Sequence, residues 1–133
     1  MSVGLDTSVT LRLLTGVPEL QARAAQAFVA TASETVTISD LVVSETYFAL
    51  LHHYAVPHSD AVRALSALLT DARIRGTGIA VNVLGTLAAS RATSAPRPGV
   101  MNRLIHGEYA RDGITLVTFD RDLARLPDVH QLR

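Results

Sequence analysis

The stretch LVTFDRD, residues 116–122, begins as an apolar run and ends in Asp120 and Asp122 on either side of one arginine. The first four residues have the length and the β-branched content of a short buried strand. Carboxylates that follow a strand lie at the carboxyl edge of its sheet, where open α/β sheets bind ligands. The function of this stretch therefore depends on what the other strands deliver to the same edge.

Short apolar runs alternate with helical patterns along the rest of the chain. Residues 3–5 and 36–38 are predicted strands, residues 114–119 form the strand that contains LVTF, and residues 128–132 are expected to add an edge strand. Helices are predicted over residues 7–16, 18–32, 41–54, 60–74 and 100–112, with a short turn over 121–126. Such alternation predicts one α/β domain over residues 1–133, a three-layer α/β/α sandwich with a central, mostly parallel sheet.

Two of these helices carry clear apolar stripes. The stripe of the helix over 60–74 consists of Val62, Leu65, Leu68 and Leu69. The stripe of the helix over 100–112 consists of Met101, Leu104, Ile105 and Tyr109, and Gly113 is its expected stop. Between them the pattern is weak: residues 79–85 fit either a strand or a helix, and residues 93–99 read as a loop.

Composition excludes several classes of protein. The formal net charge is zero, so bulk attraction to nucleic acid or to an anionic membrane is not expected, and any such binding must be local. The chain has no cysteine, which excludes disulfides, thiolate zinc sites and cysteine nucleophiles. No apolar run approaches a membrane span and no secretory signal is recognisable, so a soluble, cytoplasmic protein is expected.

Three carboxylates stand out by their positions. Asp6 and Asp120 each follow a predicted strand, so they either face one crevice or simply cap the helices that follow them. Glu45 lies in a helix that is apolar on most sides, and burial of a lone carboxylate there is costly. A buried Glu45 would need a partner, either an arginine or a hard cation such as Mg²⁺ or Mn²⁺.

Four segments in order along the chain resemble one known family. The opening VGLDTSV, the segment SETYFALL, the segment NRLIHGEYA and the closing LVTFDRDLARLP together resemble a PIN domain, most closely the VapC-type toxins of bacterial toxin–antitoxin pairs. The resemblance implies an endoribonuclease that depends on Mg²⁺ or Mn²⁺, an antitoxin protein as partner, RNA as substrate and a homodimer. It spans nearly the whole chain.

The resemblance also implies a set of site residues. Asp6 matches the family's first acidic residue, Glu45 the acidic residue inside its third helix, and Asp120 the aspartate of a strand-ending motif in which Thr118 is the hydroxyl. These carboxylates would bind the metal ion directly or through water, with Thr118 as a supporting hydrogen-bond partner. Glu45 would alternatively orient the attacking water.

One position departs from the family pattern. Asn102 stands where the family has a further metal-binding acid, and an amide oxygen can coordinate a cation but brings no negative charge. Metal affinity and cleavage are expected to fall by about 10- to 100-fold if the position acts from outside the coordination shell. Asp122 matches a position that is often acidic in this subgroup, so it is expected to add an auxiliary negative charge to the cluster. The substitution keeps a second reading open, a PIN fold with weakened or lost catalysis that serves as a binding module.

Three arginines are candidates for contacts with RNA phosphates or antitoxin carboxylates. Arg103, Arg121 and Arg125 lie close in sequence to the predicted crevice. Arginine suits bidentate contacts to both kinds of oxyanion. The alternative is that each one only solvates a helix face.

Overall fold

The computed structural model describes residues 2–90 and 95–133. In chain order the elements are β1 (Ser2–Gly4), α1 (Thr7–Thr15), α2 (Glu19–Thr31), β2 (Thr35–Ile38), α3 (Asp40–His52), α4 (His58–Leu69), β3 (Ile74–Gly76), α5 (Ala80–Ala89), α6 (Val100–Arg111), β4 (Leu116–Thr118), the 3₁₀ helix η1 (Leu123–Arg125) and β5 (Val129–Gln131). Helices and parallel strands form the predicted three-layer-like α/β arrangement.

The first three strands form one parallel sheet in the order β1-β2-β3. Val36 of β2 lies opposite Val3 of β1 and Ile74 of β3, so β2 is the central strand. Val36 and Ile38 are almost fully buried, which explains why this strand is the most apolar of the three. The sequence did not predict β3, because Arg75 and Gly76 interrupt a run with only one apolar residue.

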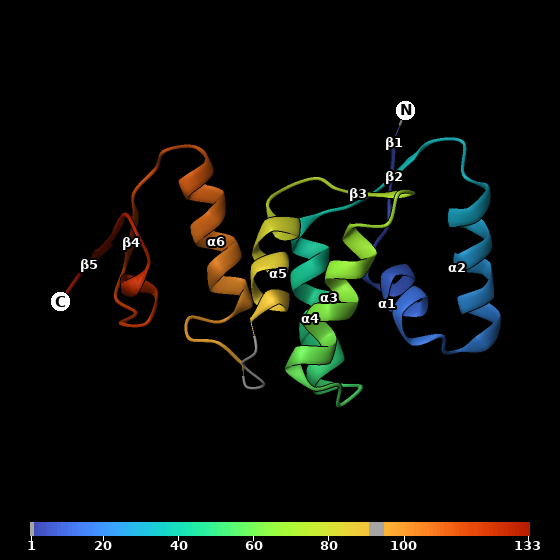
Figure 1. Cartoon of the computed structure of the whole chain (residues 1–133), viewed down its shortest axis with the longest axis horizontal. Helices are drawn as coiled ribbons and strands as arrows, with labels where there is room; N and C mark the ends of the chain where they lie inside the picture. The colour runs from blue at the N-terminus through green and yellow to red at the C-terminus, as the bar shows by residue number, and fades with distance from the viewer. Residues whose placement is uncertain (1, 91–94) are drawn as a thin grey trace.

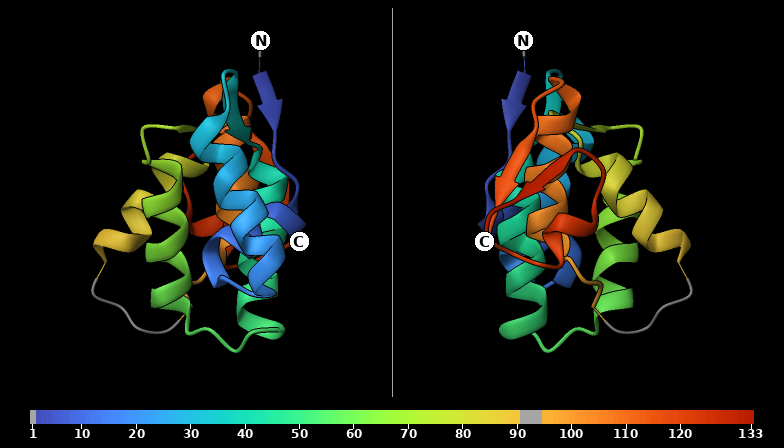
Figure 2. Two further views of the ribbon diagram at one scale, coloured as in Figure 1. Left: turned by 90° about the vertical axis from the view of Figure 1, so that its right-hand side faces the viewer. Right: turned by 90° about the vertical axis from the view of Figure 1, so that its left-hand side faces the viewer.

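The helices of the first part of the chain enclose a closed core. Helix α4 packs against α3 and α5, while α1 packs against α2 and α3. Seen end-on, α4 and α5 lie on one side of the molecule, and β1 runs along the opposite outer side (Figure 2). The predicted stripe of α4 is confirmed, since Val62, Leu65 and Leu69 are buried. Residues 79–85, ambiguous in the sequence, belong to α5 or its N-terminus.

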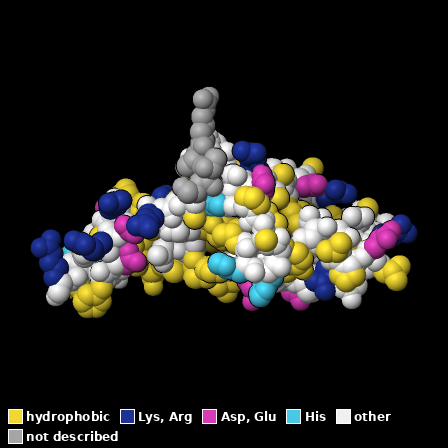
Figure 3. All heavy atoms as spheres, turned by 90° about the horizontal axis from the view of Figure 1, so that it is seen from below, with side chains coloured by type: hydrophobic (Ala, Val, Ile, Leu, Met, Phe, Trp, Pro, Cys, Tyr) yellow, Lys and Arg dark blue, Asp and Glu magenta, His cyan; other side chains and the backbone are white. Residues whose placement is uncertain are grey.

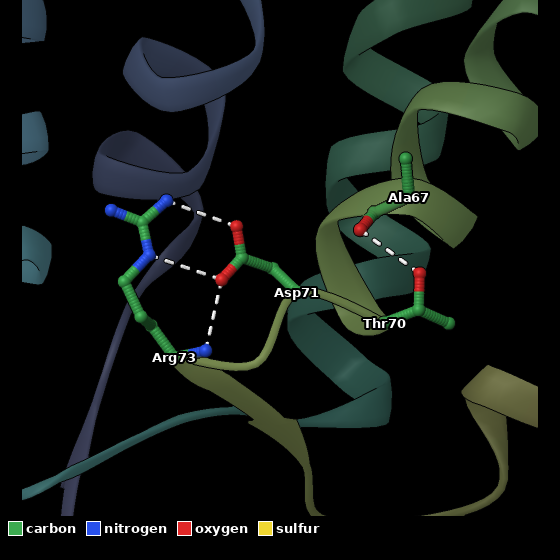
Figure 4. A network of polar contacts seen from close by, with 4 residues as sticks. All are labelled: Ala67, Thr70, Asp71 and Arg73. Atoms are coloured by element: carbon green, nitrogen blue, oxygen red, sulfur yellow. Dashed lines mark hydrogen bonds and ion pairs between the residues drawn. The ribbon is translucent and has the colours of Figure 1, made fainter.

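A polar turn sets the start of β3 (Figure 4). Arg73 donates through its backbone N–H (2.9 Å) and Nε (3.1 Å) to Oδ1 of Asp71 and through its terminal nitrogen to Oδ2 (3.0 Å). Thr70 ends α4 by donating its hydroxyl to the carbonyls of Ser66 (2.9 Å) and Ala67 (3.1 Å). The chain thereby turns from α4 into the edge strand.

The last two strands form a separate parallel sheet, in which Val117 of β4 lies opposite His130 of β5. Among residues 2–90 and 95–133, β4 pairs with β5 alone. The molecule is elongated, and β4 and β5 lie at one end of its long axis, beyond α6 (Figure 1). The predicted strand over 114–119 and the predicted edge strand over 128–132 are both confirmed, although the sheet is divided.

Helix α6 exposes most of its predicted stripe. Leu104 is 5% exposed, whereas Met101, Ile105 and Tyr109 are 45%, 39% and 43% exposed. The helix ends as predicted at Gly113, which has φ 70° and donates its N–H to the carbonyl of Ala110 (3.1 Å). Of the loop predicted over 93–99, residues 93 and 94 lie outside the described residues, and 95–99 have irregular backbone.

Two names are used below for the parts of the molecule. The N-terminal body comprises residues 2–89, from β1 to α5, and the C-terminal unit comprises residues 100–131, from α6 to β5. Within the described part of the chain, no helix has the length and apolar character to cross a membrane.

Candidate functional site

Asp6 stands two residues beyond the end of β1 and caps helix α1. Its Oδ1 accepts hydrogen bonds from the Ser8 hydroxyl (2.6 Å) and from the backbone N–H of Val9 (3.1 Å). These two hydrogen bonds lower the pKa of the Asp6 carboxyl below its usual value of 3.8. The side chain is exposed, so Asp6 is both a helix cap and a carboxylate that stays ionised at neutral pH.

Glu45 of α3 is joined to the residue that follows Asp6 in the chain. Thr7 follows Asp6 and donates its hydroxyl to Oε1 of Glu45. The prediction that Glu45 is buried is wrong: Glu45 is exposed, together with Leu41, Phe48 and His52 of the same helix face. Burial therefore does not force a partner on Glu45. The start of α1 instead contacts both carboxylates, because the Thr7 hydroxyl binds Glu45 and the Ser8 hydroxyl binds Asp6.

A groove of about 490 Å³ opens beside Glu45. It is lined by Leu41, Val42, Ser44, Glu45, Phe48 and Met101. Met101 comes from the first turn of α6, so Asn102 follows directly after a residue of the groove wall. Asn102 is half-buried. Glu45 and the residue before Asn102 therefore line the same groove.

Asp120 occupies the equivalent position after β4. Its Oδ1 accepts hydrogen bonds from the backbone N–H groups of Asp122 (2.8 Å) and Leu123 (2.9 Å), so it caps the turn that leads into η1. Its own N–H donates to the Thr118 hydroxyl (2.9 Å). Asp122 is half-buried, and its backbone is fixed by Asp120.

The structure separates the two ends of the predicted site. Asp6 lies at the start of α1 and Asp120 next to η1, with α3, α5 and α6 between these elements (Figure 1). Within the described ranges, no group of three or more acidic or histidine side chains is placed to hold a metal ion. Asp6 and Glu45 are brought together, whereas Asp120 and Asp122 are not joined to them.

The three candidate arginines differ in their exposure to solvent and in their hydrogen bonds. Arg103 donates its Nε to the carbonyl of Pro98 (2.9 Å) and is half-buried, so it holds the segment before α6. Arg121 and Arg125 are exposed. Arg121 lines a groove of about 580 Å³ with Phe119, Gln131, Leu132 and Arg133. Arginine side chains gather at this end of the molecule, while apolar side chains fill its middle (Figure 3).

The sequence match decides the family. Residues 3–129 match the PIN domain. The chain belongs to the PIN domain family. PIN domains are nucleases in general and generally use divalent metal ions.

Comparison with other proteins adds one structural likeness. No curated protein matches this PIN domain. Among solved structures, the Mycobacterium tuberculosis toxin VapC20, described as a sarcin–ricin loop cleaving toxin, is similar with 18% identity and a TM-score of 0.44. The likeness covers 100% of this chain and 99% of the toxin.

Sequence reasoning missed three residues that organise this PIN domain. Thr7 and Ser8 hold Glu45 and Asp6, and the only signal was the short opening LDTSV. Asp40 binds the start of α5, because its two carboxylate oxygens accept from the N–H groups of Ile79 (3.0 Å) and Ala80 (3.1 Å). That bond joins residues about forty positions apart, and the sequence shows Asp40 only as part of a cap for its own helix.

The donor set fits a hard divalent cation in part. Asp6 and Glu45 each use one oxygen in the hydrogen bonds above, and both side chains are exposed. Mg²⁺ keeps several waters and is commonly held by one or two carboxylates. Asp6, just beyond β1, and Glu45, held by the next residue Thr7, meet this requirement. A closed cage of protein ligands is absent from the described part of the chain.

Proposed function

We propose that this PIN domain is a metal-dependent endoribonuclease toxin that hydrolyses RNA phosphodiester bonds and is neutralised by a cognate antitoxin. The observation that carries the proposal is the hydrogen bond to Glu45 from Thr7, the residue that follows Asp6, just beyond β1, in a chain that matches the PIN family over residues 3–129. The proposal includes RNA as substrate, Mg²⁺ or Mn²⁺ as cofactor, a homodimer and a cytoplasmic location.

Asp6 and Glu45 are the residues that would hold the cation. When bound, such an ion polarises a phosphate oxygen and lowers the pKa of a coordinated water. Asp6 contributes a permanent negative charge, because the Ser8 and Val9 hydrogen bonds lower its pKa. Thr7 fixes Oε1 of Glu45, which leaves Oε2 to accept a proton from the attacking water.

Asn102, Asp120, Thr118 and Asp122 complete the set that the family resemblance implies, although the structure places Asp120 and Asp122 beside η1, apart from Asp6 and Glu45. Asp120 is the third carboxylate, held in place by Thr118 through its own N–H. Asn102 coordinates the cation weakly or not at all, so the site has one carboxylate fewer than the family pattern. The negative charge of Asp122 is therefore more important here than in the family pattern. Arg121 and Arg125 contact the RNA backbone. Arg103 instead holds the segment before α6 through its hydrogen bond to the carbonyl of Pro98.

The test is RNA cleavage by the unsubstituted chain and two matched variants, each with Mg²⁺, with Mn²⁺ and with a chelator. We expect cleavage that requires the metal, a gain of about 10- to 100-fold in Asn102→Asp, and loss of cleavage in Asp6→Asn. Cleavage that persists in the chelator would contradict metal dependence. Equal activity in the natural chain and in Asn102→Asp would remove Asn102 from the site.

The same assay separates the second candidate function, a catalytically weakened PIN fold that acts as a binding module. Asn102 is the observation that favours it. If the natural chain and Asn102→Asp both fail to cleave RNA but bind an antitoxin protein, the binding module replaces the ribonuclease. If Asn102→Asp cleaves and the natural chain does not, the chain is a weakened member of a nuclease lineage.

A further inference from the structure

A groove of about 620 Å³ lies between helices α1 and α2, which pack against each other at the end of the molecule away from β4 (Figure 1). Its lining includes the buried apolar side chains of Leu5 and Ala25. Helix α1 contributes Arg12 to it, and helix α2 contributes Gln21 and Phe28. No acidic side chain is among the described residues that line it. The groove therefore combines an apolar surface with one positive charge.

Arg12 carries that charge, and neutral groups hold it in place. Its Nε donates to Oε1 of Gln21 (2.8 Å), and its Nη1 donates to the carbonyl of Ser8 (3.4 Å). Across residues 2–90 and 95–133 Arg12 forms no ion pair, whereas Arg23 of α2 is paired with Glu19. Because no carboxylate neutralises the half-buried guanidinium of Arg12, it is available to an oxyanion such as phosphate.

Phe28 adds an exposed aromatic ring to the same groove. Its side chain is 45% exposed. Ala24, one turn before it on α2, is small, and Gly4 of β1 has no side chain, so neither fills the groove. Exposed aromatic rings stack the unpaired bases of single-stranded nucleic acid. The ring and the guanidinium thus suit the two different parts of a nucleotide.

Helix α2 sets the spacing between these two groups. Phe28 follows Gln21, which holds Arg12, by seven residues, so the two side chains lie on one face of the helix, two turns and ~10 Å apart. The amide nitrogen of Gln21 is not used in the bond to Arg12 and can donate to a ribose or base oxygen. One nucleotide can therefore contact all three side chains.

The groove adjoins the proposed cation site. Ser8 lines the groove and donates its hydroxyl to Oδ1 of Asp6 (2.6 Å). Arg12 lies one turn further along α1. An RNA strand with a phosphate at Asp6 would therefore bring a neighbouring nucleotide to the groove.

We propose that the groove between α1 and α2 binds one unstacked nucleotide of single-stranded RNA next to the cleaved bond, with its phosphate on Arg12 and its base on Phe28. Gln21 positions the guanidinium. The unpaired positive charge and the lack of acidic lining residues favour an anionic ligand, and the exposed ring favours one with a base. The place of the nucleotide beside the cleaved bond rests on the proposed function, whereas RNA binding in the groove does not require cleavage.

The test measures RNA binding separately from cleavage. Fluorescence anisotropy of a labelled single-stranded oligoribonucleotide, in a chelator, gives the affinity of each variant. We expect Phe28→Ala to weaken binding by about 5- to 150-fold, the effect of losing one base–aromatic stack, and Phe28→Tyr to retain most of the affinity. Leu20→Ala is the matched control, because Leu20 is 82% exposed on the same helix but does not line the groove. It should bind RNA as the unsubstituted chain does.

The salt dependence of binding separates the charge from the ring. Arg12→Gln should weaken binding by about 10-fold or more and reduce the slope of log affinity against log salt by ~0.7, the value for one phosphate contact with a single strand. Phe28→Ala should leave the slope unchanged. Arg23→Gln removes the same charge from an exposed position outside the groove, so it should change neither the affinity nor the slope.

A third substitution fills the groove without removing a polar group. Ala24→Leu changes an exposed helical position, so circular dichroism should be unchanged while RNA binding weakens. RNA affinity that is the same in Arg12→Gln, Phe28→Ala, Ala24→Leu and the two controls would overturn the proposal, and the groove would then be assigned to a protein partner.

Cleavage assays distinguish failure of this inference from failure of the proposed function. RNA cleavage with an unchanged KM in both Arg12→Gln and Phe28→Ala would overturn the nucleotide site and leave the ribonuclease intact. RNA binding that depends on Arg12 and Phe28, in a chain that cleaves no RNA with any metal ion, would support the groove and overturn the ribonuclease.

Discussion

Helices α4 and α6 carry similar apolar stripes but meet different surroundings. Helices α3 and α5 enclose the buried stripe of α4, which consists of Val62, Leu65 and Leu69. Helix α6 buries Leu104 but leaves Met101, Ile105 and Tyr109 exposed. The pattern along a helix shows which face needs a cover but not where the cover comes from. In the N-terminal body the cover is local, and in the C-terminal unit it is incomplete.

The largest expected difference in stability is between matched truncations in these two helices. Leu65→Ala removes a fully buried side chain and is expected to lower the free energy of unfolding by ~2–5 kcal/mol. Ile105→Ala removes a side chain that is 39% exposed and should cost about 1 kcal/mol or less. Urea denaturation at low protein concentration measures both. Equal losses would break the comparison.

The sequence predicted local structure better than it predicted contacts between distant segments, for a physical reason. Short-range patterns, such as the α4 stripe and the Gly113 stop, depend on neighbours within a few residues and were confirmed. The strand β3 and the division of the sheet depend on which strands meet, and no local pattern encodes that choice. The site divides in the same way: Asp6 and Asp120 follow their strands as predicted, but the exposure of Glu45 depends on tertiary packing.

The next effect concerns the hydrogen bonds that join the start of α5 to Asp40 of α3. Asp40→Ala removes the acceptor for the Ile79 and Ala80 N–H groups and should lower the free energy of unfolding by ~1–2 kcal/mol. A Cβ at Gly78 would clash with the carboxylate of Asp40, so Gly78→Ala should displace the same carboxylate. The two substitutions should therefore be less than additive in a thermal or urea denaturation series. Full additivity would contradict the shared mechanism.

A smaller effect tests how closed the core of the body is. The Tyr47 hydroxyl and His58 Nδ1 lie 2.8 Å apart in the interior, and burial lowers the pKa of His58 below 6.5. The folded state therefore binds fewer protons than the unfolded state below pH 6.5, and stability should fall as the pH falls through and below that value. His58→Asn keeps an acceptor for Tyr47 without titrating near neutrality, so its melting temperature should lose this dependence. An identical pH profile in both proteins would assign the effect elsewhere.

The smallest effect belongs to the surface of the body. Arg73 lowers the pKa of Asp71 to about 2 through its hydrogen bonds. Arg73→Ala should return that pKa toward 3.8, as an NMR titration would show, with little change in melting temperature because the pair is exposed to solvent. A large drop in melting temperature would mean that the turn before β3, rather than the core, limits the stability of the body.

The central claim is that Asp6 and Glu45 act together in one metal-dependent ribonuclease site. In the Asn102→Asp background, Asp6→Asn and Glu45→Gln should each abolish Mg²⁺-dependent cleavage of RNA, because each removes a carboxylate that would hold the cation. Cleavage at the parent rate in either variant would contradict the claim.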